Sequence, residues 1–410
     1  MNQLFNLIKQ NPFFCVVSVI GTAVSVAFVM TVFMVYNIRT ADIAPETHRS
    51  RMVDISYGYS FRTADRSNAN TGLSYRAATA VLDSLPGAEW VAYIEQSGQR
   101  YCGASPEQGK RRALYGIDLN FWKVYDIPLV AGRLFTREEM TAAREVVVIT
   151  ERTARETFGS AAAAVGKTLF VNFLPHRVVG VTVDVSSLFS YAYGEVWKPY
   201  RTDEIYAGSE GLRGRFTAVV VARRGVSSAE LIAQVDASLA RYNATLQEYT
   251  LQLPQVRTYA EGQFFPGSFL PPAALFCFFG LILLIVPAIN VSGLISSQMS
   301  RRLSELAVRK AYGASRVALM NQLLRENLLL AAVGAMAGFA LSCVVLWWGK
   351  AWMLSDTPGM DNFDVSIGLF LRPSVFAAVF AVCLLFNWMS VFIPAWHATG
   401  RPIAEVINGE

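Results

Sequence analysis

Four long stretches of the chain carry no charged side chain, and they limit the possible folds more than any other feature of the sequence. Because a helix needs about 20 predominantly apolar residues to cross a bilayer, each stretch is long enough to span a membrane. Charged residues make up 16% of the 410 residues, below the roughly 25% usual in soluble domains. The sequence therefore predicts four transmembrane helices, at 13–36, 269–295, 327–349 and 373–396.

Charges in the short loops predict the orientation of these helices. Positive charge is retained in the cytoplasm, and loop 296–326 is strongly basic whereas the short loop 350–372 is mostly acidic. Loop 296–326 is then cytoplasmic, both chain termini are cytoplasmic, and residues 37–268 form one large extracytoplasmic domain. The first stretch is longer than the apolar core of about 7–15 residues in a signal peptide, so we interpret it as a membrane anchor.

The two ends of this outer domain have similar patterns. Residues 52–59 alternate like a strand and are followed by a helix and a strand, and two strands enclose a helix again between 216 and 253. The second helix begins with a capping box, Ser227 and Glu230. The expected buried helical positions are Ala78, Val81, Leu82 and Leu85 in the first half, and Leu231, Ile232, Val235 and Leu239 in the second.

Two such halves predict one split subdomain, 45–97 plus 205–262, with a second subdomain inserted at 98–204. The insert contains strand 145–150, a helix at 151–158 that ends at Gly159, and a hairpin-like pair at 167–172 and 176–185. Cys102 is the only cysteine outside the predicted spans, so we expect no disulfide within the outer domain. The predicted fold class is an α+β membrane protein, with four transmembrane helices and this mixed α/β domain between the first two.

Motifs for nucleotide, metal and hydrolase chemistry fail on their spacing. In GSAAAAVGKT, residues 159–168, six residues separate the glycines where a phosphate-binding loop has four, and a strand follows instead of a helix. The three histidines are scattered and lack the spacing of zinc ligands, and no G-x-S-x-G motif is present. Glycosylation sequons such as the one at Asn243 are frequent by chance, and we assign it no function. The sequence does not describe an enzyme.

The spans also lack the residues of an ion-coupled carrier. Such carriers place ionisable side chains inside the membrane because the coupling ion binds at depth, and none of the four spans contains one. Asn290 and Asn387 are expected to form hydrogen bonds between helices. Gly334, Gly338 and Ser342 repeat at four-residue spacing, which predicts a small-residue face for close helix packing.

The cytoplasmic loop contains RRLSELAVRKAYGAS, residues 301–315, which predicts a short amphipathic helix that ends at Gly313. Two interpretations follow from the residues alone. The helix lies on anionic lipid, or it inserts into a groove of a cytoplasmic partner.

The same segment resembles a known family. From Arg302 it reads R-x-x-E-x-x-x-R-K-A-x-G-A-S-R and is followed by L-L-R-E-N, which is similar to the cytoplasmic loop of MacB/FtsX-like ABC transporter permeases. The outer domain contains AGRLFTREE, EVVVITERTARETFG, VGKTLFVN and HRVVGVTVDV, in order, which resemble that family's extracytoplasmic core signature. The tail PAWHATGRPIAEVING resembles its terminal motif, although Val406 and Ile407 stand where Ala-Leu is usual.

The resemblance implies that 296–326 is a coupling-helix loop that docks into an ATPase subunit. It also implies a cytoplasmic amphipathic helix at 1–12, a tail at 397–410, and a second permease protomer, identical or paralogous. ATP and Mg would be bound by a separate ATPase chain, and this chain would bind no cofactor or metal directly. The residues at the ATPase contact would be Arg302, Glu305, Leu306, Val308, Arg309, Lys310, Tyr312 and Gly313.

The function that we expect is mechanotransmission in the bacterial inner membrane. ATP hydrolysis by the partner would move the periplasmic domain and export a peptide, drug-like or lipoprotein substrate. Further expected partners are the lipid bilayer and a periplasmic membrane-fusion protein or another periplasmic protein, and no nucleic acid. One alternative within the family is an FtsX-like regulator of cell-wall hydrolases. An alternative of another class is a membrane-anchored periplasmic sensor, for which the short loop offers no output module.

Overall fold

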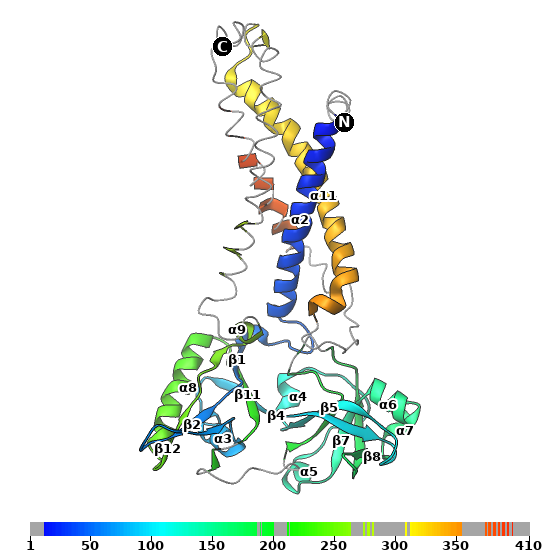
Figure 1. Cartoon of the computed structure of the whole chain (residues 1–410), viewed down its shortest axis with the longest axis vertical. Coiled ribbons are helices and arrows are strands. Elements are labelled where there is room, and N and C mark those ends of the chain that lie inside the picture. The colour runs from blue at the N-terminus through cyan, green and yellow to red at the C-terminus, as the bar shows by residue number, and fades with distance from the viewer. Residues whose placement is uncertain are drawn as a thin grey trace. The chain divides into compact units, whose positions relative to one another are not determined.

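The computed structural model describes residues 12–186, 189, 191–200, 211–212, 214–263, 308–309 and 312–354, with scattered residues at 274–282 and 374–396. The chain forms two compact units (Figure 1). The membrane unit is made from Met1–Ile38, Phe269–Leu354 and Val365–Glu410, and the outer domain from Arg39–Ser268 together with Ser355–Asp364. The predicted helix at 1–12 and the predicted spans at 269–295 and 373–396 lie mostly outside the described residues.

Two long helices form the described core of the membrane unit, α2 (Pro12–Thr40) and α11 (Arg316–Leu354). Both are long and apolar enough to cross a membrane. The helix α11 begins well before residue 327, where the third span was predicted to start. The charge-free stretch predicts only the part suited to hydrocarbon, whereas the helix continues into the charged residues before it.

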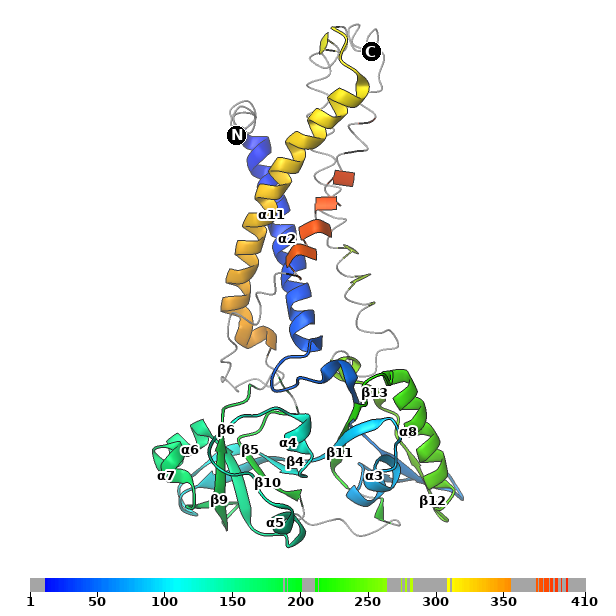
Figure 2. The same cartoon turned by 180° about the vertical axis from the view of Figure 1, so that it is seen from behind.

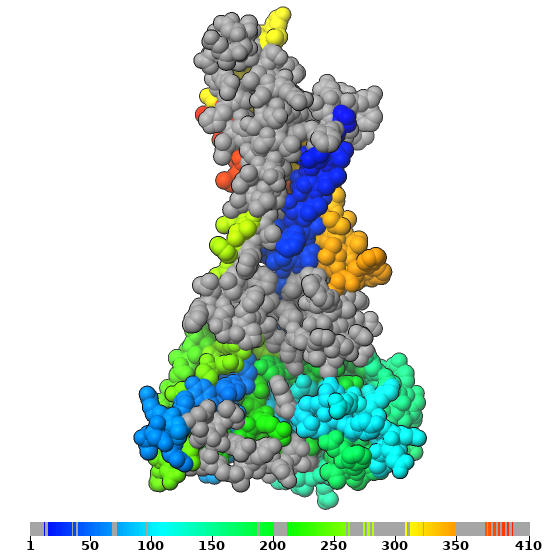
Figure 3. Space-filling model, in the orientation of Figure 1, coloured from blue at the N-terminus to red at the C-terminus, as the bar shows by residue number. Residues whose placement is uncertain are grey.

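The two helices run parallel and pack closely. Cys15 packs with Leu330 near the start of α2, and further along a Cβ on Gly338 would lie 2.5 Å from the carbonyl oxygen of Ala23. The opposite side of α2, dark blue in Figure 3, is exposed. It carries an apolar stripe at four-residue spacing, as expected of a face that contacts lipid. The stripe consists of Val16, Ile20, Val24 and Phe28, each more than half exposed.

The outer domain is built on a ten-stranded sheet with the order β13-β1-β11-β4-β5-β10-β7-β9-β6, in which β8 pairs with both β4 and β9. A separate sheet has the order β12-β2-β3. The strands are β1 (Met52–Ile55), β2 (Tyr59–Arg62), β3 (Asn68–Thr71), β4 (Ala88–Gly103), β5 (Gly109–Ile117), β6 (Leu129–Gly132), β7 (Val146–Thr150), β8 (Thr168–Val171), β9 (Leu174–Thr182), β10 (Val196–Pro199), β11 (Phe216–Ala222), β12 (Tyr249–Gln252) and β13 (Val256–Thr258).

Helices lie at both ends of the large sheet. Figure 2 shows α3 and α8 together at one end and α4 to α7 around the strands of the other. Their bounds are η1 (Arg49–Arg51), α3 (Tyr75–Leu82), α4 (Phe121–Val124), α5 (Arg137–Thr141), α6 (Glu151–Phe158), α7 (Ala161–Ala164), α8 (Ser228–Asn243) and α9 (Tyr259–Gln263). The strand β4 continues from one end to the other through an irregularity between Gln96 and Gly98, and the division into two subdomains stays a prediction.

Most local predictions in the insert are confirmed. The strand β7 is fully buried between β10 and β9, and α6 follows it at once. Thr150 caps the start of α6 by accepting a hydrogen bond from the backbone N–H of Thr153. Gly159 ends the helix with a φ of +89°, a conformation that glycine adopts without a steric penalty. The strands β8 and β9 form the predicted hairpin.

The split half departs from prediction in two ways. Residues 52–59 do not form one strand, because β1 ends at Ile55 and β2 begins at Tyr59 in the other sheet. The strand β12 pairs with β2 in that smaller sheet. The strand β13 therefore takes the edge position beside β1 in the large sheet. Ile232 and Leu239 of α8 are only half-buried, and Ser238 is buried in their place because its hydroxyl donates to the carbonyl of Val81. Alternation along the sequence cannot show where a strand bends out of one sheet into another.

Of the two hydrogen bonds in the predicted capping box at Ser227, the structure shows the one to the serine side chain. The hydroxyl of Ser227 accepts from the backbone N–H of Glu230 at 3.2 Å. A full box, with the reciprocal bond from glutamate to the cap, occurs instead at Thr136 and Glu139 of α5.

Candidate functional site

The predicted coupling segment ends in a tight turn directly before α11. The backbone N–H of Tyr312 donates to the carbonyl of Val308, and that of Ala314 donates to Arg309. Gly313 has a φ of +91°, which is the geometry that ends helices at a glycine. The hydroxyl of Ser315 then accepts from the backbone of Ala318 at the start of α11. One short turn therefore joins the two helical segments.

This turn presents apolar side chains to the outside. Tyr312 is 90% exposed and Val308 is 54% exposed. Arg309 points elsewhere, because its guanidinium donates to the side-chain oxygen of Gln322 at 3.0 Å, and Gln322 donates in turn to Glu326. The side chain of Arg309, which we predicted to contact an ATPase, therefore links the turn to α11 of its own chain by a hydrogen bond.

The remaining predicted residues fall into two groups. Arg302, Glu305, Leu306 and Lys310 lie outside the described residues. Gly334, Gly338 and Ser342 lie on α11, where both glycines face α2, and Ser342 is fully buried. A Cβ on Gly334 would lie 2.8 Å from the Cβ of Thr22.

The start of α11 also contacts the end of the fourth predicted span, a contact that we did not predict. The guanidinium of Arg316 donates to the carbonyl of Trp396 at 2.7 Å and lies 4.0 Å from the centre of its ring. Nearer the other end of α11, the rings of Phe339 and Phe376 are 4.3 Å apart. These two contacts show that the described residues at 374–396 run antiparallel to α11. The aromatic belt at the ends of the spans is the sequence signal that could have indicated the Arg316 contact.

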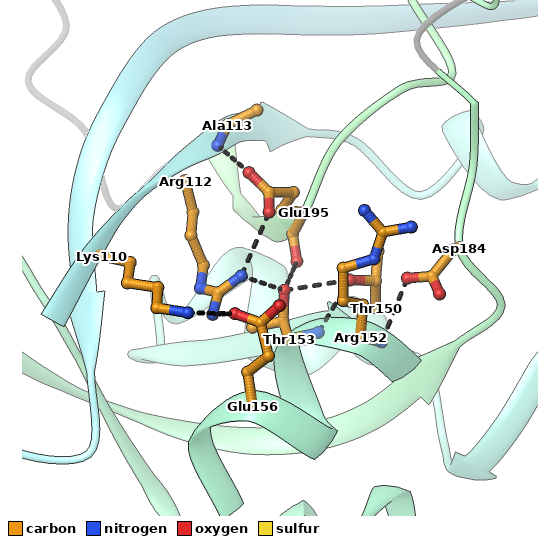
Figure 4. Close-up of polar contacts among 9 residues, drawn as sticks. All are labelled: Lys110, Arg112, Ala113, Thr150, Arg152, Thr153, Glu156, Asp184 and Glu195. Atoms are coloured by element: carbon orange, nitrogen blue, oxygen red, sulfur yellow. Dashed lines mark hydrogen bonds and ion pairs between the residues drawn. The ribbon is translucent and has the colours of Figure 1, made fainter. Parts of the chain in front are cut away.

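Two residues of the core signature, Thr153 and Glu156, belong to an ion-pair cluster around the buried Arg112 (Figure 4). The guanidinium of Arg112, on β5, donates to Glu195 at 3.1 Å and to Glu156 of α6 at 3.0 Å. Its side chain is only 4% exposed. Thr153 and Lys110 complete the cluster, and the hydrogen bond from Lys110, with Arg112, lowers the pKa of Glu156. Because the charges in the cluster are paired with one another, we interpret the cluster as structural.

Other polar groups that the sequence singled out are structural. The side-chain amide of Asn243 donates to and accepts from the backbone of Leu251 at 2.9 Å, so it holds β12. Burial raises the pKa of the Cys102 thiol to about 12, which keeps it unreactive. In the part of the chain that the structure describes, no group of three or more His, Cys, Asp or Glu residues could hold a metal ion.

Comparison with protein families gives this geometry its context. Residues 16–238 match the model of the MacB-like periplasmic core domain, and residues 277–403 match that of the FtsX-like permease C-terminal domain. The first match alone covers more than half of the chain. The chain therefore belongs to the MacB/FtsX-like family of ABC transporter permeases, inner-membrane proteins with a periplasmic domain.

Individual relatives carry a more specific name. The macrolide export ATP-binding/permease protein MacB of Chromobacterium violaceum is 25% identical over 286 residues, which are 70% of this chain and 42% of that protein. The MacB protein of Escherichia coli K12 is 26% identical over 276 residues, which are 67% of this chain and 40% of the length of that MacB protein. This chain thus spans about two-fifths of the length of these curated relatives.

Among solved structures, the periplasmic region of MacB from Actinobacillus actinomycetemcomitans is 20% identical. The match covers 50% of this chain and 89% of that one, with a TM-score of 0.36.

Proposed function

We propose that this chain is a permease subunit that transmits the work of a separate ATPase chain to its periplasmic domain. The observation that carries the proposal is the exposed helix end at Val308–Gly313, joined to α11 by one short turn. Tyr312 and Val308 supply apolar contacts to the ATPase, and Glu305 and Lys310 supply charged ones. In this proposal ATP and Mg are bound by the ATPase subunit.

The path of the movement follows from the packing of the membrane unit. The 39 residues of α11 span about 58 Å at roughly 1.5 Å per residue, well beyond the roughly 30 Å of the hydrocarbon core. A displacement of its cytoplasmic end moves the whole helix. Because Gly334 and Gly338 leave no free space against α2, and packed interiors have low compressibility, α2 moves with it. The chain continues from α2 directly into the outer domain.

The arrangement in the membrane completes the proposal. Both termini and the Val308–Gly313 turn lie in the cytoplasm, and two permease protomers, identical or paralogous, work as a pair. The movement serves the export of a peptide, a drug-like molecule or a lipoprotein from the periplasm. Support for export comes from the relatives named for macrolide export, which share about a quarter of their aligned residues with this chain.

The test is purification of the full chain from its native membrane in mild detergent, with ATP hydrolysis assayed in the eluate. Tyr312→Ala and Lys310→Glu should each reduce recovered ATPase about tenfold or more, the effect of losing roughly 1.4 kcal/mol of binding free energy. Arg155→Ala, which breaks an exposed ion pair on α6, is the control and should recover as much ATPase as wild type. Equal recovery with all variants would show that the ATPase docks elsewhere.

A further inference from the structure

A fully buried carboxylate lies just after the chain leaves α2. Glu46 is 0% exposed and belongs to residues 41–51, which we call the incoming segment because it directly follows α2. Residues 256–263, comprising β13 and α9, are the outgoing segment because they precede the second predicted span. Both segments belong to the outer domain.

The carboxylate of Glu46 joins three parts of that domain. It accepts hydrogen bonds from Arg49 Nε at 2.5 Å within the incoming segment, and from the hydroxyl of Tyr259 at 2.6 Å in the outgoing segment. The third donor is the backbone N–H of Ala192, which lies in the loop of the insert that leads to β10. The two tied segments are far apart in sequence, and one side chain holds them both.

Neighbouring contacts reinforce this connection to the insert. The backbone N–H of Asp126, just after α4, donates to the carbonyl of Pro45 at 2.8 Å. The guanidinium of Arg49 lies 5.0 Å from the ring centre of Phe189, in the same loop as Ala192. These contacts attach the insert directly to the incoming segment. The large sheet connects them only indirectly, from β1 through β11 and β4 to β5.

The chemistry of the cluster suits a rigid connection. A buried carboxylate is destabilised unless it is paired and hydrogen-bonded, and apolar residues of the same volume would hold the fold at least as well. Burial raises the pKa of Glu46, and Arg49 and Tyr259 partly offset this effect. Hydrogen bonds are directional, whereas apolar packing is not. The bonds to Glu46 therefore fix the three segments in one relative geometry.

We propose that Glu46 is the junction through which a displacement of α2 reaches the inserted part of the outer domain. This inference rests on the proposed function, because it needs an ATP-driven movement of α2. Glu46 and Tyr259 are positioning residues: they contact neither ATP nor substrate, and they carry the movement of the incoming segment to Ala192 and Asp126.

The experiment uses the full chain with its co-purified ATPase in lipid nanodiscs. Hydrogen–deuterium exchange of the peptide over residues 121–127, which includes the Asp126 amide, is compared with and without ATP and vanadate. Wild type should show an ATP-dependent change in exchange. Tyr259→Phe removes one hydroxyl and leaves the Glu46–Arg49 pair intact, and Glu46→Gln removes the charge. Both variants should keep ATP hydrolysis and lose most of the ATP-dependent change.

The matched control is Glu156→Gln, which removes a carboxylate from the Arg112 cluster on α6, away from both segments and from the loop that contains Ala192. It should retain the ATP-dependent change, which separates the loss of the junction from a general loss of stability. If Tyr259→Phe and Glu46→Gln respond to ATP as wild type does, Glu46 is not the junction while the proposed function stands. If wild type with bound ATPase gives no ATP-dependent change anywhere in the outer domain, the proposed function fails and the junction with it.

Discussion

At the scale of single residues, the outer domain buries acids whose protonation depends on the fold. Asp118 is 7% exposed, and its carboxylate accepts from the backbone N–H of Phe121 at the start of α4. Burial, with a smaller contribution from the negative charge of Asp83, raises its pKa from 3.8 to about 7. A folded-state pKa above the unfolded value stabilises the protein at low pH, and this contribution is lost as the pH rises through about 7.

Asp118→Asn should therefore flatten the pH dependence of stability. Between about pH 5 and pH 8, wild type should lose about 2–3 kcal/mol of unfolding free energy relative to the variant. Asp54, whose pKa burial raises to about 6, is present in both proteins, so its effect cancels. The measurement is unfolding of the full chain in detergent, followed by tryptophan fluorescence. Parallel pH curves for the two proteins would contradict the prediction.

The Arg112 cluster gives a second prediction for single residues. Arg112→Ala leaves Glu195 without its buried cation, and we expect a loss of about 3–5 kcal/mol in the unfolding free energy of the outer domain. Lys110→Ala is the matched control, because the Lys110 side chain is 70% exposed and its ion pair should contribute at most about 1 kcal/mol. Urea unfolding of both variants tests this prediction. Similar losses of unfolding free energy would show that the buried ion pair contributes no more than the exposed one.

At this scale, sequence patterns predict that a residue lies in a close contact better than they predict which residue it contacts. Small residues at Gly334 and Gly338 predict a close helix contact through their spacing alone. Arg49 lies only three positions from Glu46, but Tyr259 lies 213 positions away, and Glu195 lies 83 positions from Arg112. The sequence therefore gave no sign that these two charges are buried. Burial of a charged side chain depends on such distant partners, so only the folded chain reveals it.

At the scale of elements, the close contact between α2 and α11 can be tested directly. A Cβ on Gly338 meets the backbone of α2, which cannot move aside as a side chain can. Gly338→Ala should therefore destabilise the membrane unit by about 1–3 kcal/mol. Gly21→Ala on α2 meets no atom within 4 Å and should be neutral, or stabilising by up to about 1 kcal/mol through helix propensity.

Thermal denaturation of the two glycine variants in the same lipid nanodiscs distinguishes these outcomes. If Gly338→Ala is as stable as Gly21→Ala, the two helices do not depend on the glycine contact.

Element boundaries were harder to predict than element types. The helix α6 and its Gly159 end are confirmed because the cap, the periodicity and the terminal glycine all lie within one short segment. The prediction of one strand at 52–59 was wrong, because the alternation continues while the chain passes from one sheet to another between Ile55 and Tyr59. The helix α11 begins at Arg316 and contains the predicted span 327–349, because hydrophobicity marks the part suited to the bilayer and not the ends of the helix.

At the scale of the whole molecule, the sequence alone indicated the family, and the two family matches confirm it. What the chain does in a complex depends on surfaces whose partners are other molecules. The central claim is that the turn at Val308–Gly313 is the place where an ATPase docks. Tyr312, at 90%, is the most exposed of the residues that the structure describes in this turn.

The most direct test replaces Tyr312 with a photo-cross-linking amino acid and irradiates intact native membranes. The same replacement at Tyr57, which is 38% exposed on the outer domain, is the control. We predict that position 312 forms a cross-linked product containing an ABC ATPase and that position 57 does not. No ATPase adduct at position 312, or the same adduct at both positions, would contradict the account.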